Sequence, residues 1–406
     1  MEAWKLNLIS VWFGCFFTGM AMSQILPFLP LYVEQLGVDG HESLSIWSGL
    51  VFSGTFLVSA IVSPWWGSLA DRRGRKLMLL RASLGMATLI ALQGLVSNVY
   101  QLFALRALMG LTSGYIPNAM ALIASQIPRN KSGWALGTLS TGPISGVIVG
   151  PLLGGLMADH LGLRVVFFVT AVMMFVSFLV TLFLIKENHT VIKKADQPSG
   201  AALFRSLPYP GVIITLFVST MMVQLANSSI SPILTLFIRD LTLTDYKDNI
   251  AFVSGMIAAI PGVAALISAP RLGRLGDRIG TARILAMALA FTALLFAIMT
   301  WVQTPIQLGI LRFLLGFADG ALMPAIQVLL LRYSPSQATG RIFGYNQSFM
   351  YLGNVVGPLI GSSVSAMMGF RWVFIVTAIL VLINFILVQH RVTRVERSLS
   401  VSQPRG

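Results

Sequence analysis

One acidic residue, Asp319, lies near the middle of a long apolar stretch, 306–331. The chain has 14 acidic residues, and nearly all the others fall between such stretches or at their ends. An ionisable side chain at the centre of a membrane span is costly and usually takes part in function. A carboxyl group at that depth can exchange protons near neutral pH. Asp319 is therefore a candidate for proton coupling, and the alternative is a structural ion pair with Arg312 or Arg106.

Three further charged residues are candidates for the same chemistry. Arg312 comes seven residues before Asp319, which is about two helical turns along one face. Arg106 lies in an earlier apolar stretch, where Glu34 and Asp319 are its possible partners and a structural bond between helices is the alternative. Glu34 lies at the end of the first apolar stretch. The simpler interpretation is that Glu34 is a solvated loop residue rather than a proton or substrate site.

Hydrogen-bonding side chains within the apolar stretches form a second candidate set. Amides and phenols among many Met and Phe side chains would make an adaptable, mostly apolar pocket, because Met repacks easily. The alternative is that each amide joins two helices, which contributes about 0.6 kcal/mol per hydrogen bond. For the set as a whole, a cavity is favoured. The set comprises Gln24, Tyr115, Asn118, Gln224, Asn227, Tyr345, Asn346, Gln347 and Asn354.

The elements that must position these residues are membrane-spanning helices. Of the 406 residues, 56% are hydrophobic and 10% charged, whereas a soluble domain has about 25% charged residues. Twelve apolar runs reach the ~20 residues that a spanning helix needs, too long for the strands of a membrane barrel. The predicted fold is all-α, with twelve transmembrane helices. The runs begin near Leu8, Leu44, Leu77, Leu102, Trp134, Val165, Gly211, Ile250, Ile284, Ile306, Ile342 and Trp372.

The distribution of basic residues predicts how the helices cross the membrane. The net charge is +14, and most Lys and Arg residues fall in the loops of one predicted side. By the positive-inside rule this side is cytoplasmic, so both termini should be cytoplasmic. The same clustering accounts for the positive charge without a nucleic-acid partner. Arg81 lies one turn into the third predicted helix, just after the basic turn at 67–76. Its long side chain should extend the charge toward the cytoplasm.

Several motifs recur at a steady offset along the chain. The Arg-x-x-x-Gly motif at 106–110 returns at 312–316, 206 positions later, and the Gly-Pro pair at 150–151 returns at 357–358, 207 positions later. Steady offsets in unrelated motifs indicate an internal duplication. Parallel repeats of six helices typify transporters whose site lies near the bilayer midplane, between the halves. We predict halves at 1–185 and 209–390, a cytoplasmic linker at 186–208 and a cytoplasmic tail at 391–406.

A short turn at 67–76 carries the densest charge, and a degenerate copy lies at 273–280. A carboxylate near a helix N-terminus gains ~0.3–1 kcal/mol from the helix dipole. The aspartate of each turn could therefore hold a helix of the opposite half and close the cytoplasmic side, which would favour the outward-open state. The alternative is that the basic residues only fix the topology. The proposed latch comprises Gly67, Asp71, Arg72, Gly74, Arg75, Gly273, Asp277 and Arg278.

Together these motifs resemble the major facilitator superfamily, in particular its drug:proton antiporter branch. The turn at 67–76 is similar to the signature between the second and third helices of that superfamily, and Arg106 with Gly110 is similar to its fourth-helix motif. The fifth helix carries a sequence similar to the antiporter motif, which exporters have and importers generally lack. This motif and its second copy comprise Gly146, Gly150, Pro151, Gly154, Gly357 and Pro358.

The resemblance implies a proton-coupled exporter of drugs or other amphipathic small molecules that works by alternating access and contributes to antibiotic resistance. It implies a monomer in the bacterial inner membrane, driven by the proton gradient without a cofactor. Arg106 would transfer protons or hold a carboxylate, and helices 1, 4, 7 and 11 would line the cavity. The Gly-Pro motifs would pack the two halves together near the outer mouth. Several drug:proton antiporters have a carboxylate in the middle of the first helix, where this chain has Gln24.

Other classes of protein fit the sequence less well. The sequence has no Gly-Lys pair and no Gly-x-Ser-x-Gly, so a P-loop pump and a serine hydrolase are excluded. Cys15 is the single cysteine and the four histidines are scattered, so we expect no metal site and no enzyme. A transporter of a specific metabolite or sugar is the remaining alternative.

Overall fold

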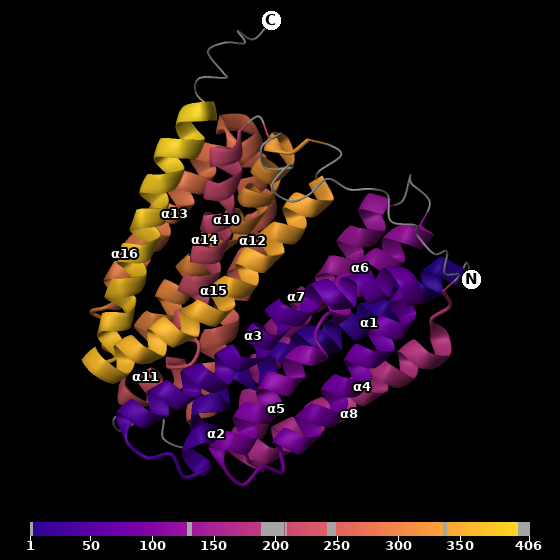
Figure 1. Ribbon diagram of the computed structural model, residues 1–406. Coiled ribbons are helices and arrows are strands. Elements are labelled where there is room, and N and C mark those ends of the chain that lie inside the picture. Colours follow the sequence, from indigo (N-terminus) through magenta and orange to yellow (C-terminus); the bar gives the residue numbers. More distant parts are fainter. Residues whose placement is uncertain are drawn as a thin grey trace, which may run out of the picture. The chain divides into compact units, whose positions relative to one another are not determined.

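The computed structural model is helical in every regular element it describes (Figure 1). The chain divides into two compact units, Met1–Lys194 with Leu234–Ala259, and Ala195–Ile233 with Ile260–Gly406. The segment 234–259 thus packs with the first unit, although it belongs to the second sequence repeat. The residues described are 3–127, 132–187, 207, 209–241, 249–335 and 339–396.

The described helices begin close to the predicted starts of the apolar runs. In the first repeat they are α1 (Ala3–Gln24), η1 (Leu26–Phe28), α2 (Leu29–Gln35), α3 (His41–Arg73), α4 (Arg75–Gln93), α5 (Val99–Leu111), α6 (Tyr115–Gln126), α7 (Ser132–Leu161) and α8 (Leu163–Leu184). In the second repeat they are α10 (Pro210–Ile230), α11 (Leu234–Leu241), α12 (Ile250–Ile279), α13 (Thr281–Met299), α14 (Pro305–Tyr333), α15 (Thr339–Met368), α16 (Phe370–Val388) and η4 (Gln389–Thr393).

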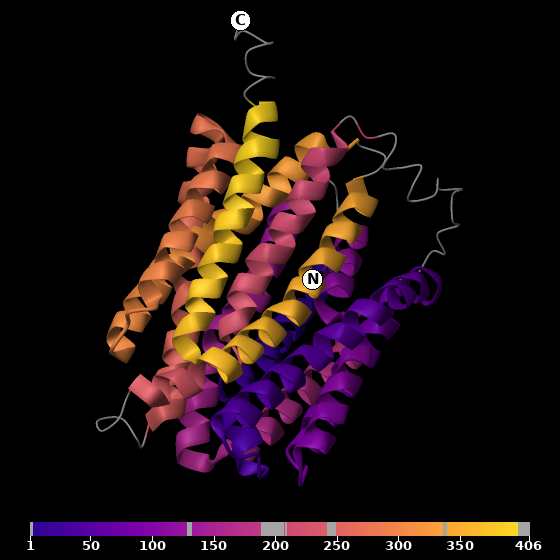
Figure 2. The ribbon, with the colours of Figure 1, turned by 60° about the vertical axis from the view of Figure 1, so that its left-hand side comes forward.

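Within the described residues, 11 helical segments are long and apolar enough to cross a membrane. The twelfth predicted span is α15, a 30-residue helix that carries several amides and small residues. Its length still exceeds the ~20 residues that a bilayer requires. Figure 2 shows α15 and α16 as long neighbouring helices of the second unit. The predicted all-α fold with twelve transmembrane helices is confirmed.

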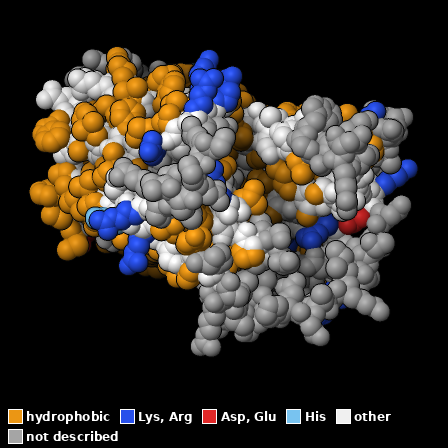
Figure 3. All heavy atoms as spheres, turned by 90° about the horizontal axis from the view of Figure 1, so that it is seen from above, with side chains coloured by type: hydrophobic (Ala, Val, Ile, Leu, Met, Phe, Trp, Pro, Cys, Tyr) orange, Lys and Arg blue, Asp and Glu red, His pale blue; other side chains and the backbone are white. Residues whose placement is uncertain are grey.

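The end of the second unit beyond α16 is basic. Arg271, Arg274 and Arg278 near the end of α12 are exposed, as are Arg391 and Arg394 beyond α16. Figure 3 views the molecule from this end and shows Lys and Arg side chains among hydrophobic ones. The predicted linker lies almost entirely outside the described residues, as does most of the tail.

The two repeats share their helix caps as well as their helices. The Asn98 side chain accepts a hydrogen bond from the Gln101 N–H at 2.9 Å, and Thr304 accepts one from the Gln307 N–H at 3.3 Å. In return, each Gln side chain accepts a hydrogen bond from the backbone N–H of the residue that precedes the capping residue. The donors are Ser97 and Gln303, and the distance is 2.9 Å in both repeats. These reciprocal bonds satisfy N–H groups that a helix start leaves free. The match supports the internal duplication.

The fourth predicted helix is broken between α5 and α6, at a Gly114 with φ of 105°. The Arg81 guanidinium donates to the Leu111 carbonyl at 3.2 Å and to the Ser113 carbonyl at 2.5 Å. It also lies 3.7 Å from the centre of the Trp66 ring. Arg81 thus supplies the donors that the carbonyls at the break need, and its predicted extension toward the cytoplasm stays a prediction.

Candidate functional site

Asp319, on α14, lies beside a polar side chain from another helix. The Asn227 amide of α10 donates a hydrogen bond to the Asp319 carboxylate at 3.3 Å. Arg312, two turns earlier on α14, is the cation that acts on this carboxylate electrostatically. The structure therefore brings an acid, an amide and a cation together within one unit, on two of its long helices.

Hydroxyl groups on α10 bind two of the predicted cavity amides. Thr220 donates to the Asn346 side chain at 2.7 Å, and Ser228 donates to the Asn354 side chain at the same distance. Both amides lie on α15, which packs along α10. These bonds join helices, as the alternative interpretation of the amides expected. The sequence analysis missed the hydroxyls, although their eight-residue spacing places them on one face of α10.

The remaining predicted cavity residues of the second repeat are half-buried or exposed. Gln224 is half-buried on α10, at the point where Gly353 of α15 comes close to the α10 backbone. Tyr345 is half-buried on α15. Gln347 is exposed, and its amide lies 3.8 Å from the Met350 sulfur. These three side chains are accessible enough to contact a ligand, as are the half-buried Asn227 and Asn354.

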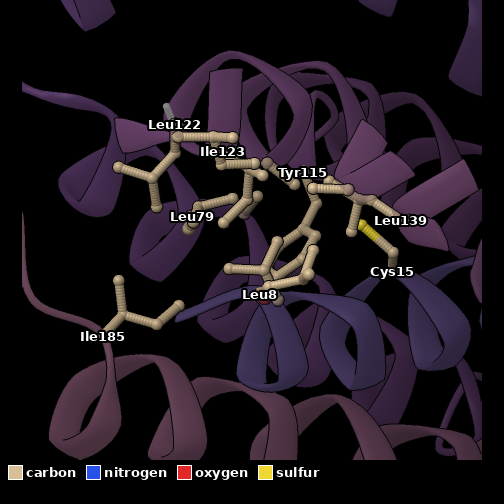
Figure 4. Close-up of a cluster of buried hydrophobic side chains, with 13 residues drawn as sticks. Leu8, Cys15, Leu79, Tyr115, Leu122, Ile123, Leu139 and Ile185 are labelled. Carbon is tan, nitrogen blue, oxygen red and sulfur yellow. The ribbon is translucent and has the colours of Figure 1, made fainter. Parts of the chain in front are cut away.

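The predicted cavity residues of the first repeat are deeply buried. Tyr115 is 1% exposed, lies in an apolar cluster with Leu8 and Leu122 (Figure 4), and its hydroxyl is 3.0 Å from that of Thr181. Asn118 donates to the Gly114 carbonyl at 2.7 Å and thereby supports the helix break. These two side chains pack the first unit.

Gln24, the last residue of α1, is fully buried. Within the described residues, neither its amide nitrogen nor its amide oxygen has a hydrogen-bond partner. A buried amide without partners costs free energy, which is unusual for a residue that serves packing alone.

Arg106 is buried on α5 with only 3% of its surface exposed. Its Nε donates to the Val51 carbonyl at 3.4 Å. Among the described residues no carboxylate lies within ion-pair distance of it, and Glu34, one of its two possible partners, instead forms a 2.6 Å ion pair with Arg239. Arg106 is therefore a buried cation whose charge is not balanced by a neighbouring acid in the described part of the chain.

Helices α3 and α4 meet at the signature turn, with only Gly74 (φ of 95°) between them. The Glu187 carboxylate, which follows α8, accepts from the backbone N–H of Arg75 at 2.8 Å and of Lys76 at 2.7 Å. Arg75 also donates to Asn118 at 3.3 Å. The sequence analysis missed Glu187 as the cap of this turn, because its partners lie more than 100 residues away.

The second copy of the turn has the same arrangement. Gly280, with φ of 104°, separates α12 from α13, and Glu396 accepts from the Ala282 N–H at 3.2 Å. Glu396 also forms a 2.6 Å ion pair with Arg332. Glu187 follows α8 and Glu396 follows α16, which are the last long helices of the two repeats. The carboxylate cap is therefore duplicated together with the turn. Of the predicted latch, Gly67 and Asp71 lie on α3 and Asp277 lies on α12, and the side chains of both aspartates are outside what the structure describes. Gly273, Arg72 and Arg278 are exposed.

Comparison with known proteins decides the family. A family model described as Major Facilitator Superfamily matches residues 11–251 and 216–405, which together cover nearly the whole chain. The chain belongs to the major facilitator superfamily. The resemblance inferred from its motifs is confirmed.

Among curated members of this superfamily, the chain is similar to multidrug resistance protein MdtG. The protein from Klebsiella pneumoniae (strain 342) is 62% identical over 94% of this chain and 92% of its own length. The protein from Yersinia enterocolitica serotype O:8 is 60% identical with the same two coverages. A solved bacterial homologue of the human lysosomal transporter Spinster matches 97% of this chain and 98% of its own, with a TM-score of 0.78 at 13% identity, which supports the fold alone.

In this superfamily member, the glycine motif of α7 packs helices within the first unit. A Cβ on Gly146 would lie 2.2 Å from the Phe16 carbonyl, and one on Gly154 would lie 2.5 Å from the Gln24 carbonyl. Gly150 likewise faces α1. On α15 the second copy, Gly357, faces α10. These glycines allow helix backbones to touch, as small residues do in membranes. Pro151 differs from the other predicted motif residues of α7, because its carbonyl faces Gly255 of α12.

Proposed function

We propose that this protein is a proton-coupled exporter of drugs or other amphipathic small molecules, working by alternating access. Three groups would carry the coupling: the Asp319 carboxylate, the Asn227 amide that bonds it at 3.3 Å and the Arg312 guanidinium on the same helix. The observation that carries the proposal is this polar contact between two membrane-spanning helices. The multidrug resistance function named for the MdtG relatives supports the choice of substrate class.

The chemistry follows from the charge that Asp319 holds in its two protonation states. As a carboxylate it accepts from Asn227 and is balanced by Arg312, so the site is nearly neutral. As a carboxylic acid it leaves the Arg312 charge less balanced and can release its bond to Asn227. Binding of an amphipathic cation near Asp319 would favour the carboxylate and expel the proton, which links the two fluxes. Arg106 would contribute a second site of charge in the first unit.

Export by a protein in the bacterial inner membrane, with both termini cytoplasmic and a monomer as the working unit, completes the proposal. The exposed arginines at the ends of α12 and α16 support this orientation through the positive-inside rule. A carrier for one metabolite or sugar is the alternative, and it differs in the range of compounds transported.

Purified protein in liposomes with an imposed pH gradient tests the substrate class. Chemically unrelated amphipathic cations should each dissipate the gradient faster in proteoliposomes than in protein-free liposomes. Sugars and amino acids should have no such effect. If one sugar or metabolite dissipates the gradient and the amphipathic compounds do not, the exporter proposal is wrong.

A further inference from the structure

One segment of the second repeat, Leu234–Ala259, belongs to the first compact unit. The segment contains α11 and the beginning of α12. Helix α11 packs against α2 and η1, and the Thr235 hydroxyl donates to the Pro27 carbonyl. The two sequence repeats therefore share defined contacts within this unit, at the ends of α2 and α7.

A single face of α7 meets the beginning of α12. Pro151, Gly155 and Asp159 are spaced by four residues and so lie on one side of the helix. A Cβ on Gly155 would lie 2.7 Å from the Ala251 carbonyl, and one on Gly255 would lie 2.1 Å from the Pro151 carbonyl. The two backbones therefore touch at this face, as small residues allow.

Asp159 caps α12 although it belongs to a different helix. Its carboxylate accepts from the Ala251 N–H at 3.2 Å and from the Phe252 N–H at 2.7 Å. The first N–H groups of a helix need acceptors from outside the helix, and α12 has no acidic residue of its own in its first turn. The carboxylate also interacts favourably with the helix dipole.

A second polar contact joins the same segment to the first repeat. Glu34 at the end of α2 and Arg239 on α11 form an ion pair of 2.6 Å, with side chains 38% and 41% exposed. Such half-exposed pairs are weakened by solvent. The pair can therefore break without burying an unbalanced charge.

We propose that Asp159, Glu34 and Arg239 form a clasp that closes one end of the transport path and opens once in each cycle. The proposal rests on the transport function proposed above. Alternating access requires contacts between the repeats to break and re-form at each end in turn. The contacts at the clasp meet that requirement. When the two repeats separate there, the polar groups of the carboxylate cap and of the ion pair can form hydrogen bonds with water.

A cysteine reporter measures opening of the clasp without any substrate. Cys15, the only cysteine, is buried and would be replaced by alanine, and Ala251, which is 2% exposed beneath Asp159, would become the single cysteine. The rate of N-ethylmaleimide labelling would be followed in purified protein in lipid nanodiscs. Asp159→Ala should raise this rate about five-fold, the effect of losing about 1 kcal/mol from the closed state. Arg239→Gln should raise it less.

The matched control is Glu42→Ala, which removes an exposed acid from the first turn of α3 and should leave the rate unchanged. Asp159→Asn keeps an acceptor for the N–H groups and should fall between wild type and Asp159→Ala. If Asp159→Ala does not fold, Arg239→Gln carries the test alone. Labelling rates equal to the Glu42→Ala control in every folded clasp variant overturn the proposal. The readout needs no transport, so failure to transport drugs would count against the proposed function only.

Discussion

The Asn227 amide donates its hydrogen bond to the Asp319 carboxylate across 3.3 Å, and so joins α10 to α14 within the second unit. Hydrogen bonds to charged groups contribute about 1.5–3 kcal/mol. Asn227→Leu removes the donor at nearly constant volume and should slow proton-coupled transport about ten-fold. Initial rates in proteoliposomes check this. Thr215→Val on the same helix is the control, because the Thr215 hydroxyl donates to the Gly211 carbonyl of its own helix at 2.8 Å; an equal loss in both variants would remove the special role of Asn227.

Arg106 should be more important for transport than for stability. Its buried guanidinium makes one 3.4 Å hydrogen bond to a carbonyl, without an acid nearby in the described part of the chain. A buried charge without a partner costs several kcal/mol, and an apolar replacement of similar size is often neutral or stabilising. Arg106→Met should therefore keep or raise the melting temperature while it abolishes transport. A melting temperature that falls by more than about 5 °C would show a structural role instead.

Glu187 should stabilise the signature turn through its cap on α4. Loss of a capping side chain typically costs about 1 kcal/mol. Glu187→Ala should lower the melting temperature of the purified protein by about 1–3 °C, measured by tryptophan fluorescence. Glu187→Gln retains an acceptor and should lower it less. Equal melting temperatures for wild type and Glu187→Ala would mean that the cap does not stabilise the turn.

The close approach at Gly146 should tolerate no added methyl group. A Cβ there would lie 2.2 Å from the Phe16 carbonyl, which is backbone and cannot move aside without shifting α1. Gly146→Ala should therefore destabilise the protein by about 1–3 kcal/mol, the cost of overpacking. Gly137→Ala on the same helix is the matched control, because no atom of another segment in the described part of the chain lies within 4 Å of the added Cβ. Thermal melts that do not distinguish the two variants would contradict the observed packing.

The twelve helices were predictable because each depends on a local property, the length of an apolar run. The duplication was predictable because its motifs stand at fixed offsets. The break before Gly114 was not, because it depends on Arg81 reaching the freed carbonyls from another helix. A Thr-Ser-Gly sequence in a membrane helix is the only local signal for it.

The candidate site was predictable in part. Asp319 stands out by its position within an apolar run, but its partner could not be chosen from sequence, since helix rotation decides which amide faces it. Tyr115 and Asn118 look like cavity residues by composition, yet they pack the first unit because α6 turns them inward. Asp159 could not be singled out from the sequence, since its two partners lie 92 and 93 residues away.

The most direct test of the account compares proton flux in Asp319→Asn and wild-type proteoliposomes. Asparagine keeps the size and polarity of the side chain but cannot exchange a proton. With an amphipathic cation that the wild type transports, release of protons from the lumen should stop in Asp319→Asn, while Glu42→Gln should behave like the wild type. Substrate-dependent proton movement at the wild-type rate in Asp319→Asn would contradict the assignment of coupling to Asp319.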